Sequence, residues 1–365
     1  MRIAYFLLNH DIKKNDGVVL KVKTQIEEWR SYGHIVKVFC FVTEEGESVL
    51  EAKQYPINPV KRYISTNLFL QKEFIEDLIH FNPDMVYFRY GVWNVTLEYL
   101  LNRYKSVVEI NTYDLGEFLL LFKRQKTVKS ALRYLAYRFL RSKILNKVAG
   151  IITVTEELAM HTSTIKYNKP KIYIPNNINL DEFKIIKDAG SFNKRIGLFF
   201  IGTPKQAWHG VDIIKKMAEH LPEFDFHIVG DEGNSDKNLF YHGYLPRDIY
   251  TAVLKKCHIC IGSLALHRKG MREACPLKTR EYLAYGYPVI TGYKDSAFFE
   301  KEPDFILNIQ DDILSGNINY AKVKNFIENN AKRVVKHEET EYFISSKILE
   351  KKRVIFFEML ILSNI

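Results

Sequence analysis

Two glutamates, Glu273 and Glu281, are separated by seven residues around the start of an expected helix. Pro276 suits the first turn of that helix, and Gly286 suits its C-terminal cap. The free N–H groups of the first turn and the amine of Lys278 favour a bound phosphate. Carboxylates accept hydrogen bonds from hydroxyl groups, so a nucleotide sugar, with hydroxyls at both ends and phosphates between, fits the pattern. The alternative is that both glutamates are solvated surface charges.

The elements that must position these residues alternate along the chain. Short apolar runs between helical patterns predict two series of strands, at 2–8, 34–41, 85–90, 106–111 and 150–155, and at 195–202, 224–230, 239–244, 257–262 and 287–292. Strands that alternate with helices indicate mostly parallel sheets covered on both faces. The turn-rich segment 174–183 separates the two series and is expected to connect two domains.

The expected fold is therefore of the α/β class, with two Rossmann-like doubly wound parallel-sheet domains facing a cleft. We expect an N-terminal acceptor-binding domain at 1–183 and a C-terminal nucleotide-sugar-binding domain at 184–340. A terminal helix at 341–365 is expected to pack back toward the first domain.

Amino-acid composition limits the classes of protein to which the chain can belong. The chain has 365 residues, 47% of them hydrophobic, and a net charge of +10, which fits a soluble protein with anionic partners. Four cysteines are too few for a disulfide scaffold and favour a reducing compartment. Cys257 and Cys260 should point to opposite faces of a strand, so they do not predict a metal site. The expected location is cytoplasmic.

The chain resembles the family-4 glycosyltransferases, which are retaining enzymes with a GT-B fold. The resemblance is carried by Glu273 and Glu281 followed by "YLAYGYPVI" and, in the family's order, by "NDGVVLKVKTQIEEWRSYGHIVKVF" at 15–39, "IPNNINLDEF" at 174–183 and "FFIGTPKQAWHGVDII" at 199–214. Together these motifs span most of the chain.

The resemblance implies a role for particular residues in holding a donor. Glu273 contacts the donor sugar near its reacting carbon, and Glu281 binds the ribose hydroxyls. Gly17 lets the N-terminal loop approach the diphosphate without a Cβ in the way, and Gly202 is a further donor-binding residue. Ala274, Cys275 and Leu277 are expected to bind the donor through their N–H groups, and Tyr244 lies against the nucleobase. The other donor-binding residues are Lys205, His209 and Lys278.

The chain departs from the family at the cations that neutralise the leaving diphosphate. Thr203 stands in place of a usual Arg and His209 in place of a usual Lys, so Lys205 or Lys278 is expected to substitute. An Asn, Asn111, stands where the family often has a His. Asn cannot transfer a proton, but it can hydrogen-bond a sugar hydroxyl.

Two acids near Asn111 are further candidates for orienting the acceptor. Asp114 and Glu117 follow it in the loop "EINTYDLGE". The alternative for all three residues is a role in capping the loop.

These implications predict a retaining, metal-independent hexosyltransferase without a cofactor. The donor is expected to be UDP- or GDP-linked, and the acceptor a saccharide or lipid-linked saccharide in cell-surface polysaccharide synthesis, not a nucleic acid. A carboxylate cluster of the kind that holds Mg²⁺ is not evident; Asp311 and Asp312 come late in the chain. Two rivals stay open: a nucleotide-sugar epimerase of the same architecture and a non-catalytic nucleotide-sugar binding protein.

The segment 122–148 holds nine Lys or Arg residues and no acid. An apolar stripe runs along it, made of Leu132, Leu135, Ala136, Phe139 and Ile144. This pattern predicts peripheral contact with the anionic inner face of a membrane. An ordinary helix with a solvated basic face is the alternative.

Overall fold

The computed structural model describes residues 1–8, 12, 17–57, 70–188 and 195–363. The chain forms two compact units, and each is described by itself. The first unit combines Met1–Pro175 with Ser346–Ile365, and the second is Asn176–Ser345. The predicted boundary at residue 183 is therefore eight residues too late in the chain.

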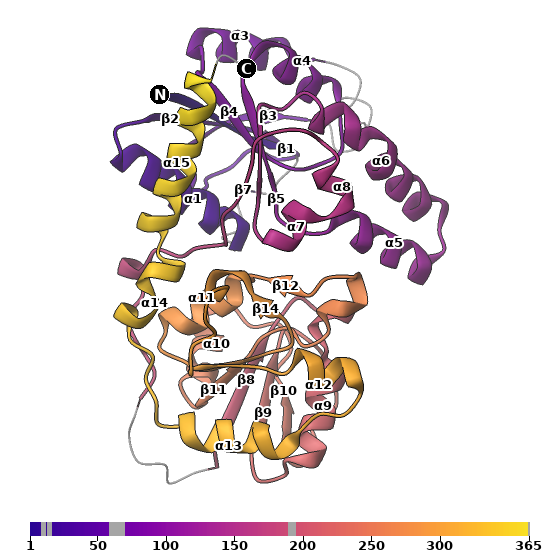
Figure 1. Ribbon diagram of the computed structural model, residues 1–365, viewed down its shortest axis with the longest axis vertical. Helices are drawn as coiled ribbons and strands as arrows, with labels where there is room; N and C mark the ends of the chain where they lie inside the picture. Colours follow the sequence, from indigo (N-terminus) through magenta and orange to yellow (C-terminus); the bar gives the residue numbers. More distant parts are fainter. Residues whose placement is uncertain (9–11, 13–16, 58–69, 189–194, 364–365) are drawn as a thin grey trace. The chain divides into compact units, whose positions relative to one another are not determined.

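The first unit is built on a seven-stranded sheet whose neighbouring strands are all parallel (Figure 1). The strands follow the order β3 (Ala52–Pro56), β2 (Ile35–Val42), β1 (Arg2–Leu8), β4 (Met85–Arg89), β5 (Ser106–Ile110), β6 (Gly150–Thr153) and β7 (Lys171–Tyr173). Because alternate side chains of a strand point to opposite faces, Tyr5 and Phe6 belong to different core clusters. Both faces of the sheet are therefore buried, as parallel sheets require.

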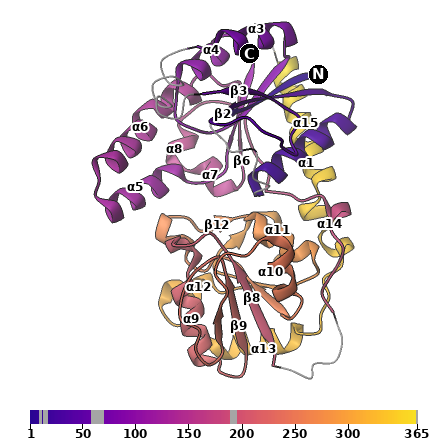
Figure 2. The same cartoon turned by 180° about the vertical axis from the view of Figure 1, so that it is seen from behind.

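Helices cover both faces of this sheet. They are α1 (Gly17–Ser31), α3 (Lys72–Phe81), α4 (Val95–Arg103), α5 (Asp114–Gln125), α6 (Val128–Leu145), α7 (Glu156–Met160), α8 (Thr162–Ile165) and α15 (Ser346–Leu362). Figures 1 and 2 show α1 and α15 side by side in both views. Residues of α1 and α15 belong to one core cluster, and residues of α3, α4 and α6 to the other.

The second unit has a six-stranded parallel sheet and a separate two-stranded one. The larger sheet runs β10 (Leu239–Tyr241), β9 (Asp225–Val229), β8 (Gly197–Ile201), β11 (Ile259–Ile261), β13 (Val289–Thr291) and β15 (Ile306–Asn308), and the smaller pairs β12 (Glu273–Ala274) with β14 (Lys294–Asp295). Its α-helices are α9 (Val211–His220), α10 (Arg247–Leu254), α11 (Leu277–Ala284), α12 (Gln310–Ser315), α13 (Tyr320–Asn330) and α14 (His337–Ile344), with 3-10 turns η1 (Leu180–Glu182), η2 (Ala207–His209), η3 (Leu266–Lys269) and η4 (Ser296–Phe298).

The segment 176–183 belongs to the second unit because its contacts are made there. The side chain of Asn176 donates to the carbonyl of Cys275 at 2.8 Å, and the backbone of Ile178 donates to that of Ile344 at 2.9 Å. Leu180 lies in a core cluster of the same unit. Hydrogen bonds to residues about a hundred or more positions away could not be read from the local turn pattern.

The predicted terminal helix at 341–365 is two helices instead of one. The chain leaves α14 through Ser345, whose backbone is extended (φ −66°, ψ 132°), and α15 begins at Ser346. Ile344 packs in the core of the second unit, whereas Leu349 packs in the core of the first. Because the helix breaks at Ser345, residues before the break pack in the core of the second unit and residues after it pack in the core of the first.

Candidate donor and acceptor sites

The carboxyl edge of the second unit's sheet is formed by short, close-packed loops. The strands β8, β9, β11 and β13 are followed directly by Gly202, Gly230, Gly262 and Gly292. A Cβ on Gly230, whose φ is +88°, would overlap the carbonyl oxygen of Gly202, and a Cβ on Gly202 would lie 2.6 Å from His209 Nδ1. Glycine is therefore required at both positions, and the loop after β8 lies directly against the His209 ring.

His209, which stands where the family has a Lys and was expected to bind the donor, is uncharged in the structure. The side chain is buried, and burial, with the neighbouring charge of Lys278, lowers the pKa of its imidazole to about 2. Its ring packs near that of Phe200, with centroids 5.6 Å apart. At neutral pH His209 is an uncharged hydrogen-bonding group.

Lys278 places a buried amine at this edge of the sheet. Its Nζ lies 4.3 Å from the centroid of the Phe200 ring, and this buried amine has no hydrogen-bond partner among the described residues. Burial lowers the pKa of Lys278 to about 7. A buried ammonium without a partner is costly, so this position favours an anionic ligand. Lys205, the other predicted cation, is exposed in a left-handed turn (φ 62°).

Glu281, on α11, is held by two side chains of α10. Its Oε1 accepts a hydrogen bond of 2.7 Å from the Tyr250 hydroxyl and lies 3.2 Å from Arg247 Nη2. The carboxylate is about a quarter exposed, at 23%. Arg247 and Tyr250 were missed by the sequence reasoning, although "PRDIY" places both on one face of a helix.

The segment from Glu273 to α11 is fixed by buried contacts. Arg280 forms a buried, two-bond ion pair with Asp295, at 2.6 and 2.8 Å, and donates to the carbonyl of Asn176. Glu273 and Ala274 form strand β12, with Glu273 in register with Lys294. Cys275 is buried, and Leu277 begins α11. Their backbone is thus held in place before the free N–H groups of the helix start.

Tyr244, the predicted nucleobase contact, follows Gly243, which has a φ of +63°. Its ring is 84% exposed. It is therefore accessible to a flat ligand and makes no core contribution.

In the first unit, a side chain of α1 contacts the predicted residue Asn111. Gly17 is the first residue of α1, and Lys21, one turn later, donates from Nζ to Asn111 Oδ1 at 2.8 Å and to Glu109 Oε1 at 2.9 Å. Asn111 follows β5 directly and is half-buried. The residues 13–16, which precede Gly17 in the predicted loop, lie outside the described residues.

Asp114 was predicted to orient an acceptor, and its contacts argue against that role. Both of its carboxylate oxygens accept from Arg141 Nη1, at 2.8 and 2.9 Å, and both residues are buried. Glu117 accepts a hydrogen bond from the Thr112 hydroxyl. Asp114 thus holds α5 against α6, and it is not among the groups that we propose to contact an acceptor.

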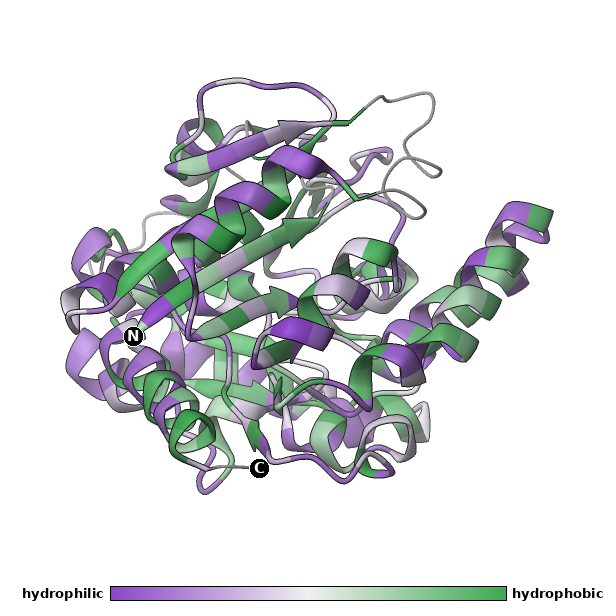
Figure 3. Ribbon diagram, turned by 90° about the horizontal axis from the view of Figure 1, so that it is seen from above, coloured by the Kyte–Doolittle hydropathy of each residue, from purple (hydrophilic) through white to green (hydrophobic). Residues whose placement is uncertain are grey.

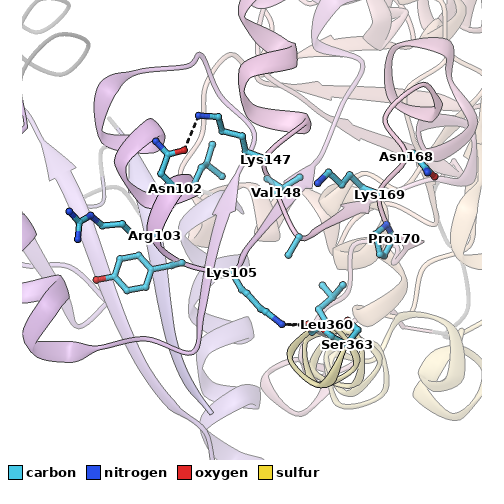
Figure 4. Close-up of a pocket in the computed structure, with 13 residues that line it drawn as sticks. Asn102, Arg103, Lys105, Lys147, Val148, Asn168, Lys169, Pro170, Leu360 and Ser363 are labelled. Atoms are coloured by element: carbon cyan, nitrogen blue, oxygen red, sulfur yellow. Dashed lines mark hydrogen bonds between the residues drawn. The ribbon is translucent and has the colours of Figure 1, made fainter. Parts of the chain in front are cut away.

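A pocket of about 350 Å³ lies at the opposite, amino edge of the first unit's sheet, before β5, β6 and β7 (Figure 4). Two of its lysines already have partners. Lys105 donates to three carbonyls at the end of α15, and Lys147 contacts Glu98 and Asn102. The pocket therefore has the features of a helix-capping region and is not the candidate site.

Groups of three or more His, Cys, Asp or Glu residues that could hold a metal ion do not occur within the described residues.

A comparison with known sequence families matches part of the second unit, and a comparison with solved structures matches nearly the whole chain. Residues 208–342 match the sequence family described as "Glycosyl transferase-like". The match includes His209, Glu273, Lys278 and Glu281 and covers just over a third of the chain. No curated protein matches the chain significantly.

Several solved structures share the whole fold. A sucrose-phosphate synthase from Thermosynechococcus elongatus has a TM-score of 0.69 at 14% identity, with 99% of both chains covered. A lipopolysaccharide outer core galactosyltransferase has a TM-score of 0.61 at 12% identity, with 98% of this chain and all of that chain covered. An α-glucosyltransferase in complex with UDP and DNA has a TM-score of 0.63 at 14% identity, over 98% and 100%. At such identities the likeness shows the fold alone, and it confirms the predicted GT-B fold of two Rossmann-like domains.

Proposed function

We propose that this protein is a retaining glycosyltransferase that moves a hexosyl group from a nucleotide-diphosphate sugar to a saccharide or lipid-linked saccharide. The observation that carries the proposal is the buried amine of Lys278, which has no hydrogen-bond partner among the described residues. It lies one residue inside the start of α11 and beside the loop of Gly202. These residues lie in or beside the segment that matches a glycosyltransferase family. The fold supports the same class of protein.

In the proposed donor complex, the diphosphate lies at the start of α11, where N–H groups and the Lys278 ammonium stabilise its charge. The carboxylate of Glu281 accepts hydrogen bonds from the ribose hydroxyls, and Tyr244 lies against the base. Glu273 contacts the sugar near its reacting carbon. The donor is UDP- or GDP-linked, and we propose no metal or further cofactor.

The proposed reaction breaks the bond between the sugar's anomeric carbon and the diphosphate oxygen. The acceptor hydroxyl attacks from the face that the diphosphate leaves, and the bonding electrons depart with the diphosphate. A diphosphate oxygen takes the acceptor's proton, so no protein base is required. The neutral imidazole of His209 can donate a hydrogen bond to the leaving group but cannot neutralise its charge.

The anomeric configuration of the product tests whether the transfer is retaining. With an α-linked donor, ¹H NMR of the first product should show an α-linkage, and EDTA should leave the initial rate unchanged. A β-linked product would refute retention, and loss of activity in EDTA would refute metal independence. Interconversion of the donor sugar without transfer would instead favour the epimerase, and binding without turnover the non-catalytic protein.

A role in cell-surface polysaccharide synthesis is part of the proposal. It is supported by the fold shared with a lipopolysaccharide outer core galactosyltransferase and by the resemblance of the motifs. Another neighbour of the same fold binds DNA, so duplex DNA belongs beside lipid-linked saccharides in an acceptor panel. Transfer to DNA alone would overturn the proposed acceptor class.

We also propose that the segment 122–148 contacts an anionic membrane through α6. The residues Val128, Leu132, Leu135 and Phe139 recur at helical spacing and are 77%, 62%, 42% and 67% exposed. Ile144, predicted to join this stripe, is instead fully buried on the opposite, packed side of α6. Figure 3 shows green apolar segments along α5 and α6, the pair of helices at the right of the picture.

The charge around the stripe is complementary to an anionic surface. The cations Lys126, Lys129, Arg133, Arg138 and Lys143 on and beside α6 are exposed, and the segment contains no acid. A helix with an apolar stripe and flanking cations binds in the plane of a membrane interface. Separately, no helix in the described parts of the chain is long and apolar enough to span a bilayer.

The paired substitution Leu132→Ser and Phe139→Ser should weaken sedimentation with vesicles of 30% phosphatidylglycerol by about tenfold, because two inserted side chains are lost. The matched control is Ile79→Ser, which removes a side chain that is 53% exposed on α3. Equal binding by both variants, or equal binding of wild type to neutral phosphatidylcholine vesicles, would contradict the membrane contact.

A further inference from the structure

A buried cluster of charges lies behind the carboxyl end of β5 in the first unit. Glu109, on β5, is fully buried and pairs with Lys21 of α1 at 2.9 Å and with Arg353 of α15 at 3.1 Å. Although burial alone raises the pKa of the Glu109 carboxyl, these cations and Arg89 hold it well below its usual range. Glu109 is therefore ionised at neutral pH.

Both ends of the Asn111 amide are held by this ion pair. Its Oδ1 accepts from Lys21 Nζ at 2.8 Å, and its Nδ2 donates to Glu109 Oε2 at 3.1 Å and to the Glu109 carbonyl at 3.5 Å. A flipped amide would place its N–H groups against the Lys21 ammonium and its oxygen against the Glu109 carboxylate. The charges thus allow one orientation only.

Side chains of α15 hold the ion pair of Lys21 and Glu109 in place through further contacts. Arg353 donates from Nη1 to the Tyr87 hydroxyl at 2.6 Å and from Nε to Glu350 at 2.8 Å, and Glu350 accepts from the Trp29 indole at 2.8 Å. Side chains of α1, β4 and α15 therefore hold Glu109 in place. Burial of so many charges costs stability, so this cluster needs a reason beyond packing.

We propose that Lys21 and Glu109 are positioning residues that lock the amide of Asn111, so that the second lone pair of its Oδ1 accepts a hydrogen bond of fixed direction from an acceptor hydroxyl. An amide oxygen has two lone pairs, so Oδ1 can accept a second hydrogen bond beside the one from Lys21. This inference rests on the proposed glycosyl transfer. It assigns Lys21 and Glu109 roles that no motif in the sequence indicated.

The test uses the full chain and water as the attacking hydroxyl, so that no acceptor need be known. Lys21→Met should lower kcat for donor hydrolysis by about tenfold, with KM for the donor and affinity for the nucleotide unchanged within twofold. Lys23→Met, on the exposed side of α1, is the matched control and should leave kcat unchanged.

A double-mutant cycle distinguishes positioning from a merely structural role. If Lys21 acts through Asn111, Lys21→Met should change kcat by less than twofold in an Asn111→Ala background. Equal losses in both backgrounds would overturn the proposal. So would an unchanged kcat in Lys21→Met alone.

A second readout does not depend on turnover. The side-chain ¹⁵N–¹H₂ resonances of Asn111, assigned by their loss in Asn111→Asp, should move toward free-amide shifts in Lys21→Met. Unchanged resonances would overturn the positioning claim. If wild type turns over no nucleotide sugar while these resonances move, the proposed transfer fails but the locked amide stands.

Discussion

Lys278→Met should weaken the binding of a nucleoside diphosphate by about tenfold to a hundredfold and, in the same protein, raise the melting temperature. A charged hydrogen bond to phosphate is worth about 1.5–3 kcal/mol, which the variant loses. The unliganded protein loses a buried amine that has no hydrogen-bond partner among the described residues. Removing this desolvation cost should stabilise the fold by about 2 kcal/mol.

The pH dependence of both effects follows from the lowered pKa of Lys278, about 7 against a usual 10.5. The stability cost of the charged amine is complete below about pH 7 and fades toward pH 10.5, so the stabilisation by Met should be largest below pH 7. Nucleotide affinity of wild type should fall as pH rises above 7, because the bound anion favours the ammonium form. Affinity of the variant should be nearly flat over the same range.

Calorimetric titration with UDP and GDP from pH 6.5 to 8.5, with thermal melts of the unliganded proteins, checks this prediction. Lys215→Met replaces an exposed lysine of α9 and serves as the matched control. A variant that binds nucleotide as tightly as wild type would show that Lys278 is not the diphosphate's cation. Lower stability in the variant would show that the amine has a stabilising partner.

Glu273→Gln should separate donor binding from donor cleavage. If the carboxylate acts at the reacting carbon, its charge matters in the transition state, and the rate of nucleotide release should fall by about a hundredfold or more. The nucleotide itself should bind within twofold of wild type, because base, ribose and diphosphate contacts remain. Glu300→Gln, at an exposed position of the same unit, should match wild type in both measurements.

Rapid-quench measurement of nucleotide release at saturating donor gives the comparison. A Glu273→Gln variant that keeps more than a tenth of the wild-type rate would remove Glu273 from the reacting centre. A variant that loses nucleotide binding as well would place Glu273 at the nucleotide instead of the sugar.

Much of the fold could be predicted because local patterns determine it. The predicted strand at 2–8 matches β1, and the parallel-sheet pattern of the second unit reappears in β8, β9, β11 and β13. The strands β3 and β7 were missed, since "AKQYP" and "KIY" are short and mostly not buried. Their pairing depends on neighbours in the sheet that a local pattern does not show.

The sequence indicated which residue types form the candidate site, but it did not indicate which of their side chains are charged at neutral pH. The positions of Glu273 and Glu281 around a helix start follow from sequence spacing alone. The neutrality of His209 and the lowered pKa of Lys278 depend on tertiary burial. The pairing of Asp114 with Arg141 joins residues 27 positions apart, and no periodicity indicates it. Electrostatic roles therefore required the structure.

The most direct test of the proposed glycosyl transfer is nucleotide release from a panel of UDP-, GDP- and dTDP-sugars by the wild-type protein, compared with Glu281→Gln. We predict slow hydrolysis of one donor or a small set of donors, with an increased KM in Glu281→Gln, because the ribose loses a charged hydrogen-bond acceptor. If no donor in the panel binds or is cleaved, the proposal that this site holds a nucleotide sugar is wrong.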